Sequence, residues 1–148
     1  PLIRTARGVN DCKMHHVIAR AEDLVEANPD ARVACLGLAF KANIDDFRES
    51  PARFVASRLA RKYGDRIHVV EPYAAELPVE FTGTGAHRID IDDALECCQI
   101  LIVLVDHDVF RVVPLAERSG KLVYDTRGIW PDQPRAAEQR EPGLRLAS

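Results

Sequence analysis

The sequence predicts an α/β fold with a doubly wound, mostly parallel sheet. Three observations support this prediction. Short runs of branched apolar residues alternate along the chain with helical patterns, the connections between them are short, and the 148 residues suit a single domain. With 47% hydrophobic and 29% charged residues, the chain has enough apolar material for one core, which excludes wholesale disorder.

The first predicted helix covers residues 14–25, where apolar side chains recur at three- and four-residue spacing, and Asn28-Pro29-Asp30 ends it. A continuous apolar run over 32–38 is typical of a strand buried on both faces of a parallel sheet. Because the chain starts at Pro1 and the helical pattern begins almost at once, we expect a piece of a longer polypeptide. We assign 1–28 to the end of a preceding helical region, 29–130 to a binding domain and 131–148 to a polar tail.

A second predicted helix starts at Ser50-Pro51, because serine at the N-cap followed by proline at the first helical position is a strong start signal. Gly64 is a natural stop for this helix. Apolar runs at 67–70, 100–105 and 121–125 predict three further strands. We also expect irregular chain over 78–85 and a short helix capped by Asp92. A helix pattern covers 110–116, although Pro114 argues that the helix starts at or just before that proline.

Charge, hydropathy and cysteine usage exclude several classes of protein. Lysine and arginine total 20 against 23 acidic residues, so there is no basic excess to bind nucleic acid. The purest apolar run, 100–105, is far shorter than the roughly 20 residues of a membrane helix. The four cysteines form no C-x-x-C pair, which favours reduced, mostly buried thiols in a cytoplasmic protein with no metal site. These residues are Cys12, Cys35, Cys97 and Cys98.

Polar and cationic residues follow each predicted strand. They are Phe40 and Lys41, then Glu71, then Asp106 and His107, and finally Asp125, Thr126 and Arg127. Because ligands of open α/β sheets bind outside the carboxyl ends of the strands, Lys41 and Arg127 are the natural pair to meet an anion such as a nucleotide diphosphate. The alternative is that any α/β protein has polar strand ends. Likewise, His107 is either a catalytic candidate or a hydrogen-bonded residue at the rim.

Two glycine-rich phosphate motifs are absent. Gly37 is followed by Leu38-Ala39-Phe40, so the three-glycine dinucleotide turn is missing, and no Walker sequence occurs. The predicted architecture is therefore Rossmann-like without the pyrophosphate turn, and we do not expect it to be the primary NAD site.

An acidic segment precedes the second predicted helix. Asp45, Asp46 and Glu49 are either a metal or acid–base cluster or, as we favour, carboxylates that stabilise the start of that helix. In the second case Asp45 or Asp46 holds Arg48, which points outward.

The run from Gly37 to Ala52 closely resembles the motif that opens the C-terminal domain of the UDP-glucose/GDP-mannose dehydrogenase family. The centre of this run is Phe40-Lys41-Ala42-Asn43-Ile44-Asp45-Asp46-Phe47-Arg48-Glu49-Ser50-Pro51. Three further segments follow in that family's order: Val70-Glu71-Pro72, Leu104-Val105-Asp106-His107 and Asp125-Thr126-Arg127-Gly128-Ile129-Trp130. Residues 4–11 are similar to the end of its long central helix. The resemblance covers nearly everything except the tail after Trp130.

The resemblance implies an enzyme with three parts: an N-terminal domain that holds NAD, a central helical region that makes a dimer, and a C-terminal domain that binds a UDP-sugar. The implied reaction oxidises the sugar C6 alcohol to a carboxylate in two hydride transfers, through a thioester on a cysteine. The resemblance places Phe40 and Lys41 at the sugar nucleotide, Arg127 at the substrate, and Arg48 at NAD across the interdomain cleft.

The family's catalytic cysteine and lysine lie upstream of the central helix. We therefore expect no catalytic residue in this chain and no turnover by the chain alone, and Cys12 is not the nucleophile. Within the family, the Asn43-Ile44-Asp45-Asp46 form is most similar to members that oxidise UDP-linked N-acetylhexosamines, and the choice of hexose, glucose included, stays open. A nucleotide-binding module without a catalytic partner and a purely structural dimer domain are the alternatives from other classes.

Overall fold

A five-stranded parallel sheet organises the part of the chain that the computed structural model describes, residues 2–44 and 46–133, with side chains from residue 13 onward. The strands are β1 (Val33–Leu36), β2 (Ile67–Val70), β3 (His87–Arg88), β4 (Ile100–Val103) and β5 (Leu122–Asp125). They are arranged in the order β3-β2-β1-β4-β5, and each neighbouring pair is parallel. This confirms the predicted doubly wound α/β fold.

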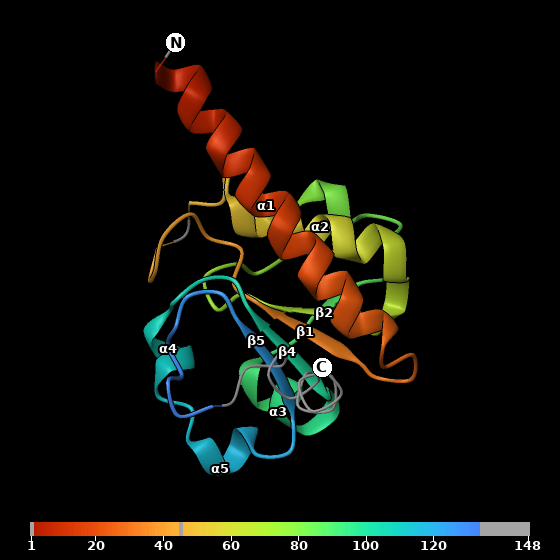
Figure 1. Cartoon of the computed structure of the whole chain (residues 1–148). Coiled ribbons are helices and arrows are strands. Elements are labelled where there is room, and N and C mark those ends of the chain that lie inside the picture. The colour runs from red at the N-terminus through yellow and green to blue at the C-terminus, as the bar shows by residue number, and fades with distance from the viewer. Residues whose placement is uncertain (1, 45, 134–148) are drawn as a thin grey trace, which may run out of the picture.

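Helices cover both faces of the sheet (Figure 1). Helices α1 (Leu2–Glu26) and α2 (Pro51–Tyr63) pack on the face that presents Val33 and Cys35, whereas α3 (Ile91–Cys97) and α4 (Asp108–Arg111) pack on the face that presents Ala34 and Leu36. A short α5 (Leu115–Arg118) follows α4. Since successive strand residues point to opposite faces and both faces are covered, the strands need continuous apolar runs.

Helix α1 is longer than the predicted 14–25. Its second half is part of the core, because Ile18, Ala21, Leu24 and Val25 are buried together with residues of β1, β2 and β4. Its first turns extend away from the sheet (Figure 1). The division of the chain at residue 28 stays a prediction.

The local signals around α2 are confirmed. The Ser50 hydroxyl accepts a hydrogen bond from the Arg53 N–H at 3.3 Å, Pro51 is the first helical residue, and Gly64 adopts a φ of 63° at the end. A 3-10 turn (Gly64–Arg66) leads from there into β2.

Three predictions on the second half of the chain are wrong in detail. Helix α3 begins at Ile91, after Asp90, and not at Asp92. Two short helices, α4 and α5, replace the helix expected over 110–116, because Pro114 separates them. Strand β3 was not predicted, since its two residues form no apolar run, and a 3-10 turn (Val79–Phe81) lies within the segment expected to be irregular.

Gly37 marks the point where the chain leaves β1. Its φ is 103°, and a Cβ atom placed on it would lie 2.5 Å from the Cβ of Val105, which follows β4. Glycine is required here because no other residue fits this close approach. The loop after β1 therefore starts in direct contact with the end of β4.

The thiols whose environment is described are free. Cys35 and Cys98 are buried and Cys97 is exposed, whereas the side chain of Cys12 lies outside the described part. Burial raises the pKa of Cys35 to about 12 and that of Cys98 to about 11, so both thiols stay protonated and unreactive. Separately, no described helix combines the length and the apolar character needed to cross a membrane.

Candidate functional site

The strand order reverses between β1 and β4, so the loops that follow these two strands diverge at the carboxyl-terminal edge of the sheet. Ligands of doubly wound folds bind in the crevice at this point. Residues 37–50, here called the β1 loop, follow β1 and carry Phe40, Lys41 and Arg48. Residues 126–130, here called the β5 loop, carry Arg127 at the same edge.

The β1 loop is closed by its own hydrogen bonds. The Phe40 N–H donates to the Asp46 carbonyl at 2.8 Å, and the Ser50 hydroxyl donates to the Ala39 carbonyl at 3.2 Å. The Phe40 ring stays about half exposed, with a relative exposure of 49%. Lys41 is exposed as well, and within the described part of the chain its ammonium group has no hydrogen bond or ion pair. The loop thus presents an aromatic ring and a cation to solvent.

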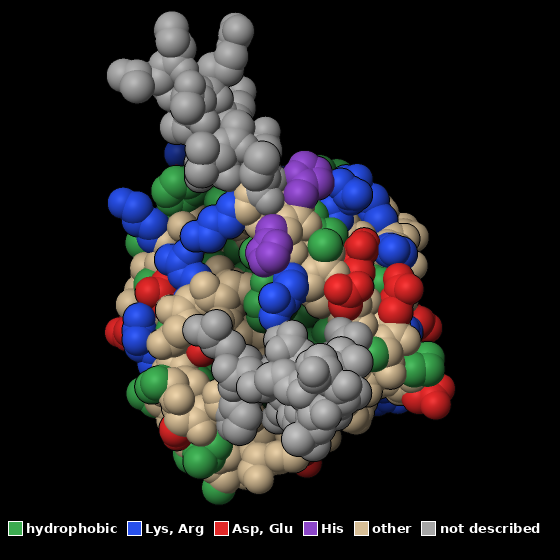
Figure 2. Space-filling view, in the orientation of Figure 1, with side chains coloured by type: hydrophobic (Ala, Val, Ile, Leu, Met, Phe, Trp, Pro, Cys, Tyr) green, Lys and Arg blue, Asp and Glu red, His purple; other side chains and the backbone are tan. Residues whose placement is uncertain are grey.

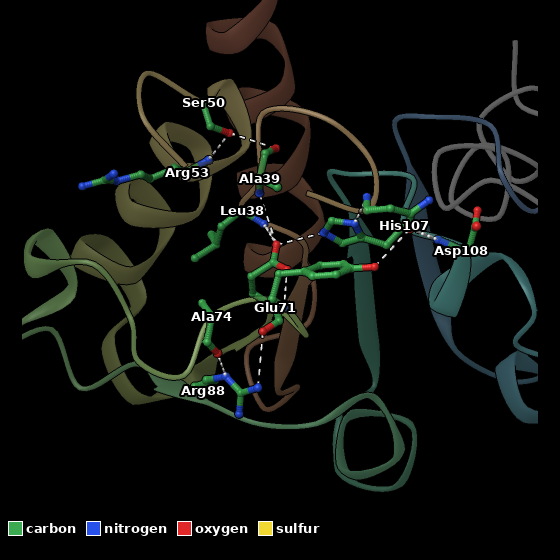
Figure 3. Close-up of polar contacts among 11 residues, drawn as sticks. Leu38, Ala39, Ser50, Arg53, Glu71, Ala74, Arg88, His107 and Asp108 are labelled. Atoms are coloured by element: carbon green, nitrogen blue, oxygen red, sulfur yellow. Dashed lines mark hydrogen bonds and ion pairs between the residues drawn. The ribbon is translucent and has the colours of Figure 1, made fainter. Parts of the chain in front are cut away.

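A buried carboxylate holds the start of this loop. Glu71, at the end of β2, accepts hydrogen bonds at Oε1 from the N–H groups of Leu38 at 2.7 Å and Ala39 at 3.2 Å (Figure 3). Its Oε2 accepts from the Tyr73 N–H at 3.0 Å. Glu71 is fully buried, so these contacts replace water.

His107, which follows β4, completes the network. Its Nε2 lies 3.0 Å from Glu71 Oε1, and its Nδ1 accepts from the Asn43 N–H at 2.7 Å. The Asn43 Oδ1 in turn accepts from the Asp108 N–H at 2.9 Å. The network therefore joins the ends of β1, β2 and β4. His107 is fully buried, so it does not reach a ligand directly, which favours the predicted hydrogen-bonded role over catalysis.

The Glu71 carboxylate is ionised despite its burial. Burial raises its pKa, but the hydrogen bonds from His107 and from the N–H groups of Leu38 and Tyr73 outweigh this effect and hold the pKa below its usual value. The site thus contains a buried negative charge that is fully hydrogen-bonded.

Asp125 organises the β5 loop. Its Oδ1 accepts from the N–H groups of Arg127 at 3.1 Å and Gly128 at 2.8 Å, and its Oδ2 accepts from the Trp130 N–H at 2.8 Å. The Trp130 indole donates to the Phe110 carbonyl at 2.8 Å, which anchors the end of the loop on α4. Arg127 therefore projects from a fixed turn.

Arg127 shares Asp106 with a second arginine. Arg127 Nη2 lies 3.4 Å from Asp106 Oδ1, and Arg111 Nη2 lies 3.1 Å from Asp106 Oδ2. Burial raises the pKa of Asp106. A backbone hydrogen bond and the two arginines lower this pKa by more than burial raises it, so the pKa of Asp106 lies below its usual value. Both guanidinium groups are about half exposed and keep free donors for an anion.

Arg48 lies on the outer side of the β1 loop. Its side chain is 88% exposed, and its Nε lies 3.2 Å from Asp46 Oδ1, which confirms that Asp46 holds it and that it points outward. Asp46 also accepts from the Arg48 N–H, and Ser50 caps α2, so the prediction that Asp46 stabilises the helix start is wrong. Asp45 lies outside the described residues.

The predicted cations share one edge but follow strands that are not neighbours. Lys41 follows β1 and Arg127 follows β5, with β4 between these strands. In the orientation of Figure 1, the β1 loop runs on the left of the molecule, and lysine and arginine side chains lie on that side as well as at the upper right (Figure 2). The roles of Glu71, Asp106 and Arg111 were not predicted.

A cavity of about 540 Å³ lies at the opposite, amino-terminal edge of the sheet. Arg32, Asp65, His68 and His87 are among its lining residues, and none of the predicted site residues is. Both ring nitrogens of His68 are buried without a hydrogen-bond partner among the described residues, and burial lowers the pKa of this histidine. Over the side chains described, residues 13–44 and 46–133, no group of His, Cys, Asp and Glu is arranged to hold a metal ion.

The turn after β1 does not fit a dinucleotide. In a Rossmann site the N–H groups of this turn bind the pyrophosphate, but here the N–H groups of Leu38 and Ala39 are buried and bonded to Glu71. The described residues therefore do not form a dinucleotide pyrophosphate site at β1.

Comparison with known proteins gives consistent matches. A model described as the UDP-glucose/GDP-mannose dehydrogenase family, UDP binding domain, matches residues 34–132. The chain is 42% identical over 137 residues to the UDP-N-acetyl-D-mannosamine dehydrogenase of Salmonella typhi, a match that covers 87% of this chain and 32% of that protein. It is 40% identical over 129 residues to the NDP-N-acetyl-D-galactosaminuronic acid dehydrogenase of Ralstonia solanacearum, covering 87% of this chain and 30% of that protein.

Among solved structures, a UDP-glucose dehydrogenase from the archaeon Pyrobaculum islandicum is similar, with a TM-score of 0.67 and 27% identity. This match covers 91% of the chain and 30% of that protein. The chain thus spans about a third of the length of the relatives it matches.

Proposed function

Since this chain belongs to the UDP-glucose/GDP-mannose dehydrogenase family and contains its UDP-binding domain, we propose that it is the substrate-binding part of an NAD-dependent UDP-N-acetyl-D-mannosamine 6-dehydrogenase. The parent enzyme oxidises the C6 alcohol of the sugar to a carboxylate in two hydride transfers. It is a cytoplasmic dimer or larger oligomer, in which residues 1–28 end the central helical region, 29–130 bind the UDP-sugar and 131–148 form the tail.

The observation that carries the proposal is a group of exposed cations at the carboxyl-terminal edge of the sheet. Lys41 has no ion pair among the described residues, and Arg111 and Arg127 share the single carboxylate of Asp106. These three side chains keep donors for the two negative charges of the pyrophosphate of a UDP-sugar.

Each predicted residue has a distinct role in this proposal. Lys41 acts as a flexible point charge on the pyrophosphate, and Arg127 donates to it as a planar fork. Asp106 holds Arg127 in place, at 3.4 Å, before the ligand arrives. The half-exposed Phe40 ring packs against the sugar nucleotide.

NAD, which accepts the hydride, binds mainly to the part of the parent enzyme outside this chain. The lack of free N–H groups at Leu38 and Ala39 supports this assignment. Arg48, which is 88% exposed, extends toward the cofactor across the interdomain cleft. No residue of this chain is assigned a catalytic role, and the chain alone does not turn over. Reduced nicotinamide formed by the purified chain from NAD and UDP-sugar would contradict this.

A second candidate is a dehydrogenase of a different nucleotide-linked N-acetylhexosamine. The 40% identity to the NDP-N-acetyl-D-galactosaminuronic acid dehydrogenase favours it almost as strongly as the 42% identity favours the first. Rates of the full-length enzyme with the UDP-linked forms of N-acetylmannosamine, N-acetylgalactosamine, N-acetylglucosamine and glucose distinguish these substrates.

Calorimetric titration of this chain with UDP tests the binding function. Lys41→Ala and Arg127→Ala are each expected to weaken binding by about tenfold or more, because a hydrogen bond to a charged group contributes about 1.5–3 kcal/mol. Arg61→Ala, which removes an exposed cation near the end of α2, is the matched control and should bind as the wild type does. Absence of heat at millimolar UDP, or equal binding by all variants, would overturn the proposal.

A further inference from the structure

We propose that Glu71 and His107 are positioning residues for the nucleotide: together they set the conformation of the β1 loop segment that carries Phe40 and Lys41. The inference concerns how the site is built, and its binding readout rests on the function proposed above. The effect on amide hydrogen exchange in the β1 loop does not depend on that function.

The hydrogen bonds fix the protonation of the His107 ring. Because the Asn43 N–H donates to Nδ1 at 2.7 Å, Nδ1 carries no proton. The ring proton is therefore on Nε2, which donates to Glu71 Oε1 at 3.0 Å. A neutral imidazole in this tautomer accepts at one end and donates at the other, so it links the loop to the buried carboxylate.

The pair holds the loop on both sides of the predicted ligand residues. Glu71 binds the N–H groups of Leu38 and Ala39, just before Phe40, and His107 binds the N–H of Asn43, two residues after Lys41. Asn43 has a φ of 62°, in the left-handed region, which asparagine adopts more readily than most residues other than glycine. Such a conformation persists where the surroundings hold it in place, and here His107 and the N–H of Asp108 do so.

The His107 ring is itself held rigidly. The Tyr73 ring lies 5.0 Å from it and the Phe110 ring 5.3 Å from it, measured between centroids. Neither Glu71 nor His107 is exposed, so neither side chain touches a ligand at the surface. Their effect on binding is exerted through the loop.

Loss of this pair is expected to weaken binding without removing any ligand contact. The apparent affinity of a site falls in proportion to the fraction of molecules that hold the binding conformation. If the loop is correctly folded in about a tenth of the molecules, UDP binding weakens about tenfold.

The test uses His107→Phe in this chain. Phenylalanine keeps a ring between Tyr73 and Phe110 and removes both nitrogens, while Glu71 retains its three backbone N–H partners. We expect about tenfold weaker UDP binding by calorimetry. We also expect faster amide hydrogen exchange at residues 38, 39 and 43, with unchanged exchange in the β5 loop.

Two control variants separate positioning from general stability. His107→Gln retains an amide that can replace one of the two hydrogen bonds, so its binding and exchange should lie between those of the wild type and His107→Phe. Arg66→Met removes hydrogen bonds to the carbonyls of Ala31 and Asn28, at the opposite edge of the sheet. It is expected to lower stability and to leave UDP affinity and exchange of the β1 loop unchanged.

The outcomes are distinguishable. If the wild type does not bind UDP but His107→Phe still accelerates exchange in the β1 loop, the proposed function fails and the positioning role stands. Wild-type binding and exchange in His107→Phe would overturn the inference, as would an equal loss of affinity in Arg66→Met. If His107→Phe does not fold, His107→Gln decides: intermediate values support the inference, and wild-type values overturn it.

Discussion

The β1 loop and the β5 loop present cations at the same edge of the sheet but are built in opposite ways. Asp125 orders the β5 loop through the N–H groups of residues at most five positions away. The β1 loop depends on Glu71, 33 residues from Leu38, and on His107, 64 residues from Asn43. The first arrangement is mainly local, although the Trp130 indole also bonds to the Phe110 carbonyl. The second adds these distant partners to the loop's own hydrogen bond from the Phe40 N–H to the Asp46 carbonyl. The predicted UDP-binding segment therefore needs the pairing of β1, β2 and β4 to bring its distant partners into place.

The largest effect is expected from Glu71→Ala, which removes the acceptor at the centre of the long-range network. The N–H groups of Leu38 and Ala39 and the Nε2 of His107 would be left buried without a partner, whereas the His107 Nδ1 would keep its bond from the Asn43 N–H. We expect the free energy of unfolding to fall by about 3–5 kcal/mol, measured by urea denaturation. A loss below about 1 kcal/mol would show that water or another group replaces the carboxylate.

Acid should weaken the β1 loop through the same carboxylate. The pKa of Glu71 is lower in the folded chain than its usual value of 4.5, so its contribution to stability is fully present above that value and is lost as the pH falls through the folded pKa. The stability difference between the wild type and Glu71→Gln should therefore be largest near neutral pH and shrink below pH 4.5. A difference that is independent of pH would contradict this.

A smaller effect is expected from Asp125→Ala, which breaks the local arrangement. The N–H groups of Arg127 and Gly128 are exposed enough to bond water once the carboxylate is gone, so we expect a loss of about 1–3 kcal/mol. Amide exchange should accelerate at Gly128 and Trp130 and stay unchanged at Asn43. Accelerated exchange at Asn43 would show that the two loops are coupled, contrary to the comparison above.

The smallest effect on the fold is expected from Arg48→Ala. The Arg48–Asp46 pair is solvent-exposed, and such pairs contribute little to stability, so the unfolding midpoint should not change. In the full-length enzyme the same variant should raise the KM for NAD and leave UDP binding by the isolated chain unaltered. An altered UDP affinity would place Arg48 at the nucleotide instead.

The same contrast between local and distant contacts explains what the sequence could predict. The caps Ser50 and Gly64 and the Arg48–Asp46 pair were predicted, because each depends on residues within a few positions. The strands at 67–70 and 100–105 were predicted, since burial on both faces produces continuous apolar runs.

The missed features depend on the folded arrangement. Strand β3 is two residues, His87–Arg88, and exists through pairing with β2. Glu71 and His107 were recognised as strand-end residues, but nothing local shows that 36 positions apart they form a buried hydrogen bond. Glu71 and His107 each follow a strand, and these strands lie on either side of β1. This position could have indicated that the two side chains meet, but only once the strand order is known.

A crystal structure of this chain with UDP tests most directly whether the carboxyl-terminal edge is the nucleotide site. We predict the pyrophosphate oxygens within hydrogen-bond distance of Lys41 Nζ and the Arg127 guanidinium, with the β1 loop in the conformation described above. UDP bound instead in the cavity at the amino-terminal edge, beside Arg32 and His68, would contradict the assignment.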